Sequence, residues 1–179
     1  MEFYNKTVII TGASVGIGKA TAIEFARNGA NVCIVDINAE GLDTLAEEIK
    51  LIGANVTSYI CDVSDEQRVH EVIQEIINQY GKIDILVNNA GLWRMWKPFV
   101  ETTSDEWKKR LNVNVLGLMY FTHEVLPNMI ENAYGRIINI GSVAGVYGNA
   151  NMADYSMTKG AVSSFTKHSQ KRWLCKVLR

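Results

Sequence analysis

The chain has 179 residues, of which 47% are hydrophobic, and a formal net charge of −1 at pH 7. This length and composition predict one globular domain with a hydrophobic core, and the nearly balanced charge gives no reason to expect a nucleic-acid or membrane partner. We also expect neither a signal peptide nor a membrane helix, because the sequence contains no apolar run of about 18 residues.

The first predicted element is a β-branched strand, Thr7–Thr11, which leads through a glycine-rich turn into a helix over 16–28. Glycines let a backbone approach a pyrophosphate closely, and the N-terminus of a helix presents unpaired N–H groups to its charge. The order of strand, glycine turn and helix therefore predicts a phosphate-binding site. The spacing, G-x-x-x-G-x-G, differs from the common G-x-G-x-x-G fingerprint, and a glycine turn alone is a weak signal. The candidate cofactor contacts in this turn are Gly12, Ser14, Gly16, Ile17 and Gly18.

The second predicted strand, Asn31–Asp36, ends in a carboxylate. In a dinucleotide-binding fold this position lies near the adenosine ribose, where Asp36 can accept hydrogen bonds from the ribose hydroxyls. Asp36 would repel a 2′-phosphate, and neither Val15 nor Ile37 offers a positive charge to hold one. NAD is therefore favoured over NADP. Without the glycine turn, a role in a turn or a helix cap would explain Asp36 equally well.

Strands and helices continue to alternate along the rest of the chain. The further predicted elements are helices over 39–52, 65–80 and 104–131 and strands over 55–60, 83–88 and 136–141. This alternation predicts parallel strands joined by crossover helices, and hence an α/β fold with a doubly wound sheet. Ligands of such sheets bind beyond the carboxyl ends of the strands, where the glycine turn and Asp36 fall.

The cysteines and histidines predict no disulfide framework and no metal centre. Cys33, Cys61 and Cys175 are scattered, so we expect reduced thiols and a cytoplasmic protein. The three histidines show no ligand spacing, so we expect no metal.

The strongest chemical signal is a tyrosine and a lysine four residues apart, Tyr155 and Lys159, which follow Ser142. Positions i and i+4 of a helix share a face, so the phenol and the ammonium would lie side by side. The positive charge favours the phenolate form, which would let Tyr155 serve as general acid or base. Ser142 can offer its hydroxyl to a substrate oxygen as charge develops there. Taken alone, such a pair is more often an ordinary surface tyrosine and lysine.

Together these motifs resemble the short-chain dehydrogenase/reductase family. Three further motifs carry the resemblance: Asp62-Val63 after the third strand, Asn88-Asn89-Ala90-Gly91 after the fourth, and Asn112-Val113-Asn114-Val115 within a helix. The resemblance implies a Rossmann-like, NAD(P)-dependent oxidoreductase that transfers hydride between a nicotinamide cofactor and a carbonyl or secondary alcohol. It also implies a homo-oligomer for the full-length family, whereas the C-terminal truncation makes one doubtful for this chain.

The resemblance assigns roles to the motif residues. Ser142 would orient the substrate, Tyr155 would be the catalytic tyrosine, and Lys159 would also hold the nicotinamide ribose. Asn114 corresponds to the helix asparagine that positions a water in the proton relay. Asp62-Val63 would contact adenine, and the Asn-Asn-Ala-Gly run would support the sheet beside the cofactor. The cofactor contacts implied beyond the glycine turn and Asp36 are Asp62, Val63, Asn89, Ala90, Gly91, Tyr155 and Lys159.

The substrate is less well defined by the sequence. The segment 92–99 contains two tryptophans and a phenylalanine after a strand end, so it either borders a substrate cleft or packs against a helix. Four residues between the serine and the tyrosine are placed to touch substrate in the same way: Val143, Tyr147, Asn149 and Met152. None of them specifies more than a carbonyl or a secondary alcohol.

The C-terminal stretch departs from the family pattern. Residues 167–179 contain five Lys or Arg and no acid, whereas the family continues its catalytic helix and adds two strands and a substrate-covering segment. If one adenine is restored after the Thr166 codon, the reading frame shifts. The bases that follow can then encode a helix that contains alanines and ends in glycine. We therefore predict a frameshift, natural or from sequencing, and an out-of-frame or atypical tail at 168–179. The alternative is a basic amphipathic tail for a membrane or an acidic partner.

The predicted truncation leaves two classes of function open. It would expose strand 136–141 as a sheet edge, which favours aggregation. We expect little turnover from the chain as written and dehydrogenase activity from the restored frame. The other class is a catalytically inactive nucleotide-binding fragment.

Overall fold

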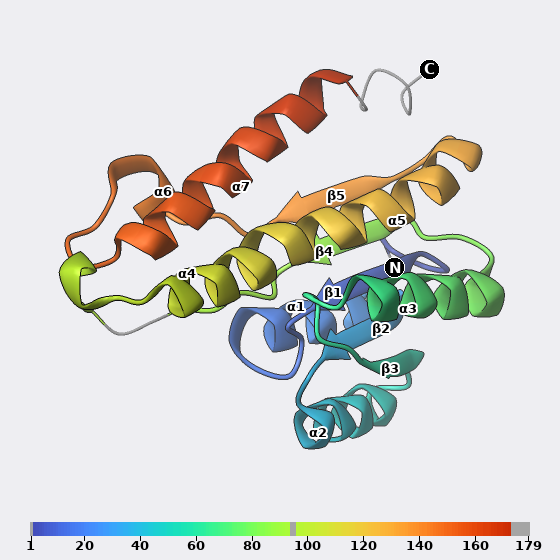
Figure 1. Cartoon of the computed structure of the whole chain (residues 1–179). Coiled ribbons are helices and arrows are strands. Elements are labelled where there is room, and N and C mark those ends of the chain that lie inside the picture. The colour runs from blue at the N-terminus through green and yellow to red at the C-terminus, as the bar shows by residue number, and fades with distance from the viewer. Residues whose placement is uncertain (1, 94–95, 173–179) are drawn as a thin grey trace.

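The computed structural model describes the backbone of residues 2–93 and 96–172 and the side chains as far as Lys167. Five parallel strands form one sheet in the order β3-β2-β1-β4-β5 (Figure 1). The predicted α/β fold with a doubly wound parallel sheet is confirmed. The strands are β1 (Thr7–Thr11), β2 (Asn31–Asp36), β3 (Val56–Ile60), β4 (Ile85–Asn88) and β5 (Arg136–Asn139).

Helices α1 to α5 lie in the crossovers between strands, and α6 and α7 follow the last strand, β5. They are α1 (Gly16–Arg27), α2 (Ala39–Leu51), α3 (Glu66–Tyr80), α4 (Ser104–Leu111), α5 (Leu118–Glu131), α6 (Ala144–Tyr147) and α7 (Ala153–Arg172). The helix predicted over 104–131 is interrupted by a π-helical segment, η2 (Asn112–Gly117), between α4 and α5. Two short segments were not predicted: α6 and the 3-10 helix η1 (Phe99–Glu101).

Two hydrophobic cores lie on opposite faces of the sheet. Successive strand residues point to opposite faces, so Val8 and Ile34 pack with α1 and α2, whereas Ile9 and Leu86 pack with α3 and α5. Figure 1 shows α7 above β5, beside the helical stretch formed by α4, η2 and α5. The last helix therefore packs mainly against other helices and a loop.

Side-chain caps precede the starts of α3 and α4. Asp65 was predicted to begin a helix, but it is the N-cap of α3 and its side chain accepts from Arg68 N–H. Helix α4 begins at Ser104 as predicted, and Thr103 before it forms a capping box with Glu106. Both caps follow from the preference of Asp and Thr for this position, where their oxygens satisfy free N–H groups.

Strand β5 is less covered than the strands beside it. Its residues are exposed or half-buried, and the Ile138 side chain is 44% exposed. Among the described strands it pairs with β4 alone. The predicted tail at 168–179 lies partly outside the described residues, because 173–179 are not described; the backbone before them continues α7 to Arg172. Within the described part of the chain, no helix combines the length and the hydropathy needed to cross a membrane.

Candidate functional site

Helix α1 begins without a side-chain cap. Its N-cap residue, Val15, has no side-chain oxygen, and its first turn contains no acid. Helices α2, α3 and α4 are instead capped by the side chains of Asn38, Asp65 and Thr103. The first N–H groups of α1 therefore remain available, and the helix dipole favours an anion beside them.

The glycines of the turn before α1 have different structural roles. Gly12 and Gly16 have φ values of +63° and +58°, which glycine adopts without strain. A Cβ atom on Gly16 would meet nothing within 4 Å, so this part of the backbone faces open space. A Cβ atom on Gly18 would lie 2.2 Å from the carbonyl oxygen of Gly12. Gly18 therefore lets α1 pack closely against the turn.

Asp36, at the end of β2, is held in place by two backbone amides. Its Oδ2 accepts from Ser14 N–H at 3.0 Å, and its Oδ1 accepts from Asn38 N–H at 3.1 Å. A carboxylate has further lone pairs, so Asp36 can still accept hydrogen bonds from a ligand. Ser14 is buried and acts here through its amide.

A cleft of about 510 Å³ opens at the carboxyl ends of the strands. Nine predicted cofactor contacts line it: Gly12, Gly16, Ile17, Asp36, Asp62, Val63, Asn89, Ala90 and Gly91. The remaining predicted contacts, Ser14, Gly18, Tyr155 and Lys159, are not among its lining residues.

Several lining residues were missed by the sequence analysis. Lys109 and Val113 line the cleft and are four residues apart in the stretch from α4 to η2, a spacing that could have identified them. Cys61 also lines it, and burial raises the pKa of this thiol to about 12, so it adds no charge.

Asn89 ties β4 to the glycine turn. Its Nδ2 donates to the carbonyl oxygens of Thr11 and Gly12, both at 2.9 Å. The backbone N–H groups of Asn89 and Ala90 both donate to Thr11 Oγ1, at 3.1 and 3.0 Å. These contacts hold two walls of the cleft together, and the part played by Thr11 was not predicted.

Asn114 is buried in the π-helical segment η2. Its Oδ1 accepts from Leu92 N–H at 2.7 Å, and its Nδ2 donates to Leu92 O and to Thr158 Oγ1, both at 3.1 Å. The side chain thus joins the loop after β4 to α7. Single turns of π-helix inside longer helices are frequent at functional sites.

Tyr155 and Lys159 lie on the first turns of α7, as predicted. The Lys159 ammonium donates to Ile140 O at 2.6 Å, and burial lowers the pKa of Lys159 below its usual 10.5. A Cβ atom on Gly91 would lie 3.5 Å from Asn114 Oδ1 and 3.7 Å from Lys159 Nζ. Asn114 and Lys159, two of the four predicted catalytic residues, therefore meet at Gly91, which also lines the cleft.

Ser142 lies in the loop between β5 and α6, where its Oγ accepts from Ala144 N–H at 3.2 Å. A Cβ atom on Gly145 would lie 2.5 Å from the carbonyl carbon of Lys159, so the backbone of α6 rests directly on α7. This close packing brings the serine loop to the turn that carries Tyr155 and Lys159.

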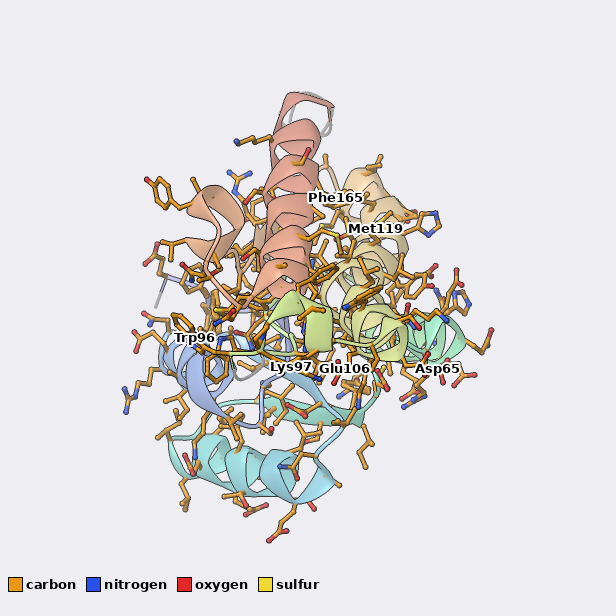
Figure 2. The ribbon with its side chains drawn as sticks, turned by 60° about the vertical axis from the view of Figure 1, so that its left-hand side comes forward. Asp65, Trp96, Lys97, Glu106, Met119 and Phe165 are labelled. Carbon is orange, nitrogen blue, oxygen red and sulfur yellow. The ribbon has the colours of Figure 1, made fainter. Side chains whose placement is uncertain are left out.

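The aromatic segment 92–99 packs against a helix in part, and its place beside a substrate cleft stays a prediction. Phe99 stacks on Trp107 of α4 with ring centroids 5.1 Å apart, which is helix packing. Trp93 and Trp96 are exposed, and Figure 2 shows Trp96 and Lys97 near the N-terminal end of α7, where Lys97 N–H donates to Asn151 O at 3.1 Å. The positions 94 and 95 lie outside the described residues.

The four residues between Ser142 and Tyr155 that were predicted to touch substrate differ in how far they are exposed. Val143 and Tyr147 are largely exposed, whereas Met152 is buried and accepts a contact from Asn149 Nδ2 at 3.8 Å. A substrate role for these four residues stays a prediction. Among the described side chains, no three of His, Cys, Asp or Glu gather closely enough to hold a metal ion.

Comparison with known proteins shows the family of this chain. The sequence model described as short chain dehydrogenase matches residues 6–176. The chain is 40% identical over 167 residues to the 3-oxoacyl-(acyl-carrier-protein) reductase FabG of Thermotoga maritima, covering 93% of this chain and 68% of the relative. It is 37% identical over 163 residues to the 7alpha-hydroxysteroid dehydrogenase of Escherichia coli strain K12, covering 91% of this chain and 63% of the relative. The chain thus spans about two thirds of the length of these curated relatives.

Solved structures of similar proteins agree with this family assignment. The crystal structure of an NAD+-bound xylitol dehydrogenase superposes with a TM-score of 0.95 at 35% identity and covers 98% of this chain and 68% of its own. A 7alpha-hydroxysteroid dehydrogenase complexed with NADH and 7-oxo glycochenodeoxycholic acid superposes with a TM-score of 0.92 at 35% identity, with the same coverage. The chain therefore belongs to the short-chain dehydrogenase family of oxidoreductases.

Proposed function

We propose that this chain is an NAD-dependent oxidoreductase that transfers hydride between a nicotinamide cofactor and a carbonyl carbon or secondary alcohol. The observation that carries the proposal is the meeting of Asn114 and Lys159 at Gly91, on the wall of a cleft. General acid–base chemistry needs a proton donor within reach of the cofactor, and α7 supplies Tyr155 one turn before Lys159.

The residues of the cleft fit a dinucleotide. The uncapped start of α1 and the backbone at Gly12 and Gly16 suit a pyrophosphate, and Asp36 suits the hydroxyls of the adenosine ribose. Asp36 opposes a 2′-phosphate, and its neighbour Ile37 brings no positive charge, so we favour NAD over NADP. The two solved structures described above contain NAD+ and NADH, which supports this choice without deciding it.

The chain's own residues would then divide the chemistry as follows. NAD, when bound, supplies or accepts the hydride. Tyr155 transfers a proton to or from the substrate oxygen, and the Lys159 ammonium favours the phenolate that this transfer requires. Ser142 donates a hydrogen bond to the same oxygen, and Asn114 fixes the loop at Leu92 against α7.

The experiment is a screen of carbonyl compounds with NADH and NADPH, followed as loss of cofactor absorbance. We expect carbonyl-dependent oxidation of NADH by the restored-frame version, abolished by Tyr155→Phe, and little turnover from the chain as written. Turnover that survives this substitution would contradict the proposed mechanism, and faster turnover with NADPH would contradict the proposed cofactor.

The second candidate is a nucleotide-binding protein without turnover. It is favoured by the exposure of the residues around the reaction site, since Tyr147 is 86% exposed and Trp93 is also exposed. NADH binding in a fluorescence titration, with no turnover of any carbonyl in the screen, would support this candidate.

We also propose a cytoplasmic location and, for the restored-frame version rather than the chain as written, a homo-oligomer. The free thiols of Cys33 and Cys61, both buried, are compatible with a reducing compartment. Sedimentation analysis of the restored-frame version tests the oligomer, and a monomer at all concentrations would contradict it.

A further inference from the structure

Arg110 and Asp154 form a buried ion pair between α4 and the first turn of α7. Their side chains are 7% and 9% exposed, and Arg110 Nε is buried without a hydrogen-bond partner in the structure. Figure 2 shows the lower end of α7 meeting α4 close to the labelled Glu106, in agreement with the contacts between these helices. Removing two charges from water offsets most of their attraction, so such a pair is weak evidence of a stabilising role.

The same carboxylate holds the backbone of the catalytic tyrosine. Asp154 Oδ1 accepts from Tyr155 N–H at 2.9 Å, while Oδ2 pairs with the Arg110 guanidinium. Tyr155 lies in the first turn of α7, where N–H groups lack partners within the helix. Asp154 therefore connects the amide of Tyr155 to a cation on another helix.

The backbone carbonyl of Tyr155 is also held by a side chain that is linked to the other helix. Thr158 Oγ1 donates to Tyr155 O at 2.8 Å and accepts from Asn114 Nδ2 at 3.1 Å. Arg110 and Asn114 are four residues apart along α4 and η2, and Asp154 and Thr158 are four residues apart on α7. Two side-chain links thus join the same two helices, one at each end of the Tyr155 residue.

We propose that the Arg110–Asp154 pair is a positioning device that fixes the Tyr155 hydroxyl relative to Lys159 and the substrate oxygen. This inference rests on the proposed catalytic role of Tyr155. Neither Arg110 nor Asp154 lines the cofactor cleft, so the pair acts on the alignment of the reacting groups and leaves cofactor affinity unchanged. Because a displacement of about 1 Å can lower a rate ~100-fold, we expect loss of the pair to lower kcat about tenfold or more.

The test compares Arg110→Met, Arg110→Lys and the double variant Arg110→Met/Asp154→Asn. The double variant leaves no unpaired buried charge, so it is expected to unfold at a urea concentration close to that of the wild type even if Arg110→Met does not fold. The readouts are kcat, KM, the NADH dissociation constant and the urea midpoint. Exchange of the Tyr155 amide hydrogen, measured by NMR relative to that of Ile34, adds a readout that needs no substrate.

A second buried aspartate supplies the matched control. At the amino ends of the strands, Asp84 accepts from Lys6 Nζ at 2.8 Å and from Thr7 N–H at 3.0 Å, so it too joins a cation to a backbone amide, with Lys82 Nζ as a second cation at 3.7 Å. The control variant is Lys6→Met/Asp84→Asn. It is expected to change the urea midpoint and to leave kcat and Tyr155 amide exchange unchanged.

The proposal requires that kcat stay low in the double variant when its stability matches the wild type, that NADH affinity stay unchanged, and that Arg110→Lys recover part of kcat. A double variant with wild-type kcat, or a control variant with an equal loss of kcat, would overturn it. If the wild type turns over no carbonyl, the proposed function fails, and amide exchange decides the inference alone. Equal exchange at Tyr155 in the wild type and the double variant would then overturn it.

Discussion

The region around β1, β2 and β4 and the region formed by β5, α6 and α7 are held together in different ways. Strands β1, β2 and β4 are almost entirely buried between helices on both faces of the sheet. Strand β5 is partly exposed along its length, and α6 ends in an exposed tyrosine. Most residues of the cofactor cleft belong to the first region, whereas the predicted Ser142, Tyr155 and Lys159 belong to the second.

Polar contacts accompany the packing of Ile137 and Ile140 against the two cores where the second region meets the first. Asn88 Nδ2 donates to Asn139 Oδ1 at 2.9 Å, and Asn139 Nδ2 donates to Thr166 Oγ1 at 3.0 Å. Hydrogen bonds are directional, so these contacts fix geometry but add little stability. The comparison implies that cofactor binding should survive changes that abolish the chemistry.

The largest effect that tests this comparison is expected from Tyr155→Phe. We expect kcat to fall roughly 10²- to 10⁴-fold, because the proton donor is lost, and NADH affinity to change far less, because only one of the predicted cofactor contacts is removed. Steady-state kinetics and a fluorescence titration measure the two quantities. Tyr134→Phe, far from the site beside Lys6, is the control. A parallel loss of NADH binding would show that the two regions are not separable.

The next effect is expected from Asp36→Ala in the first region. Loss of a charged hydrogen-bond acceptor should weaken NAD+ binding about 10- to 100-fold, with kcat at saturating cofactor nearly unchanged. Titration calorimetry with NAD+ and NADP+ provides the measurement. Asp43→Ala, on the exposed side of α2, should leave both affinities unchanged. An unaltered NAD+ affinity in Asp36→Ala would remove this residue from the site.

Two glycine substitutions sharpen the comparison with smaller effects. Gly18→Ala and Gly145→Ala each place a Cβ atom within 2.5 Å of backbone, so each should cost about 1–3 kcal/mol of unfolding free energy. We expect Gly18→Ala to lower NADH affinity and Gly145→Ala to lower kcat. Gly141→Ala meets nothing within 4 Å and serves as control. The same functional loss in both variants would contradict a division between the regions.

The smallest effect is a pH dependence from Lys159. Its folded-state pKa lies below 10.5 because of burial, so between these two values the unfolded state binds more protons than the folded state. Stability contributed by Lys159 should therefore rise with pH through its folded pKa toward 10.5. Urea unfolding from about pH 7 upward should show this rise in the wild type and its absence in Lys159→Met. Identical profiles would indicate that Lys159 is not buried as described.

The order and type of the main elements could be predicted because buried parallel strands are short apolar runs between amphipathic helices. The prediction that the last strand extends to 141 was too long by two residues. Ile140 N–H still donates to Asn88 O at 3.0 Å, but Ile140 O accepts from Lys159 instead of a strand. The lysine that binds this carbonyl is nineteen positions away in sequence, so no local pattern reveals the contact.

The candidate site was predictable where its residues form short sequence motifs. The glycine turn and the pair Tyr155 and Lys159 are local spacings, and both are placed at the carboxyl ends of the strands. The π-helical turn around Asn114 was not predicted, because one extra residue in a turn leaves the hydrophobic pattern of the helix unchanged. Arg110 and Asp154 are separated by 44 residues, so their contact depends on the packing of α4 and α7.

The two backbone amides bound by Asp36 also restrict how this cleft can change over evolution. The carboxylate orders Ser14 in the glycine turn and Asn38 at the start of α2 in addition to facing the cleft. A single mutation toward a neutral or basic residue would release both amides before any new ligand contact had formed. A lineage or an engineer that redirects this site toward a phosphorylated ribose therefore has to supply new partners for these amides at the same time, which makes the change a multi-step path.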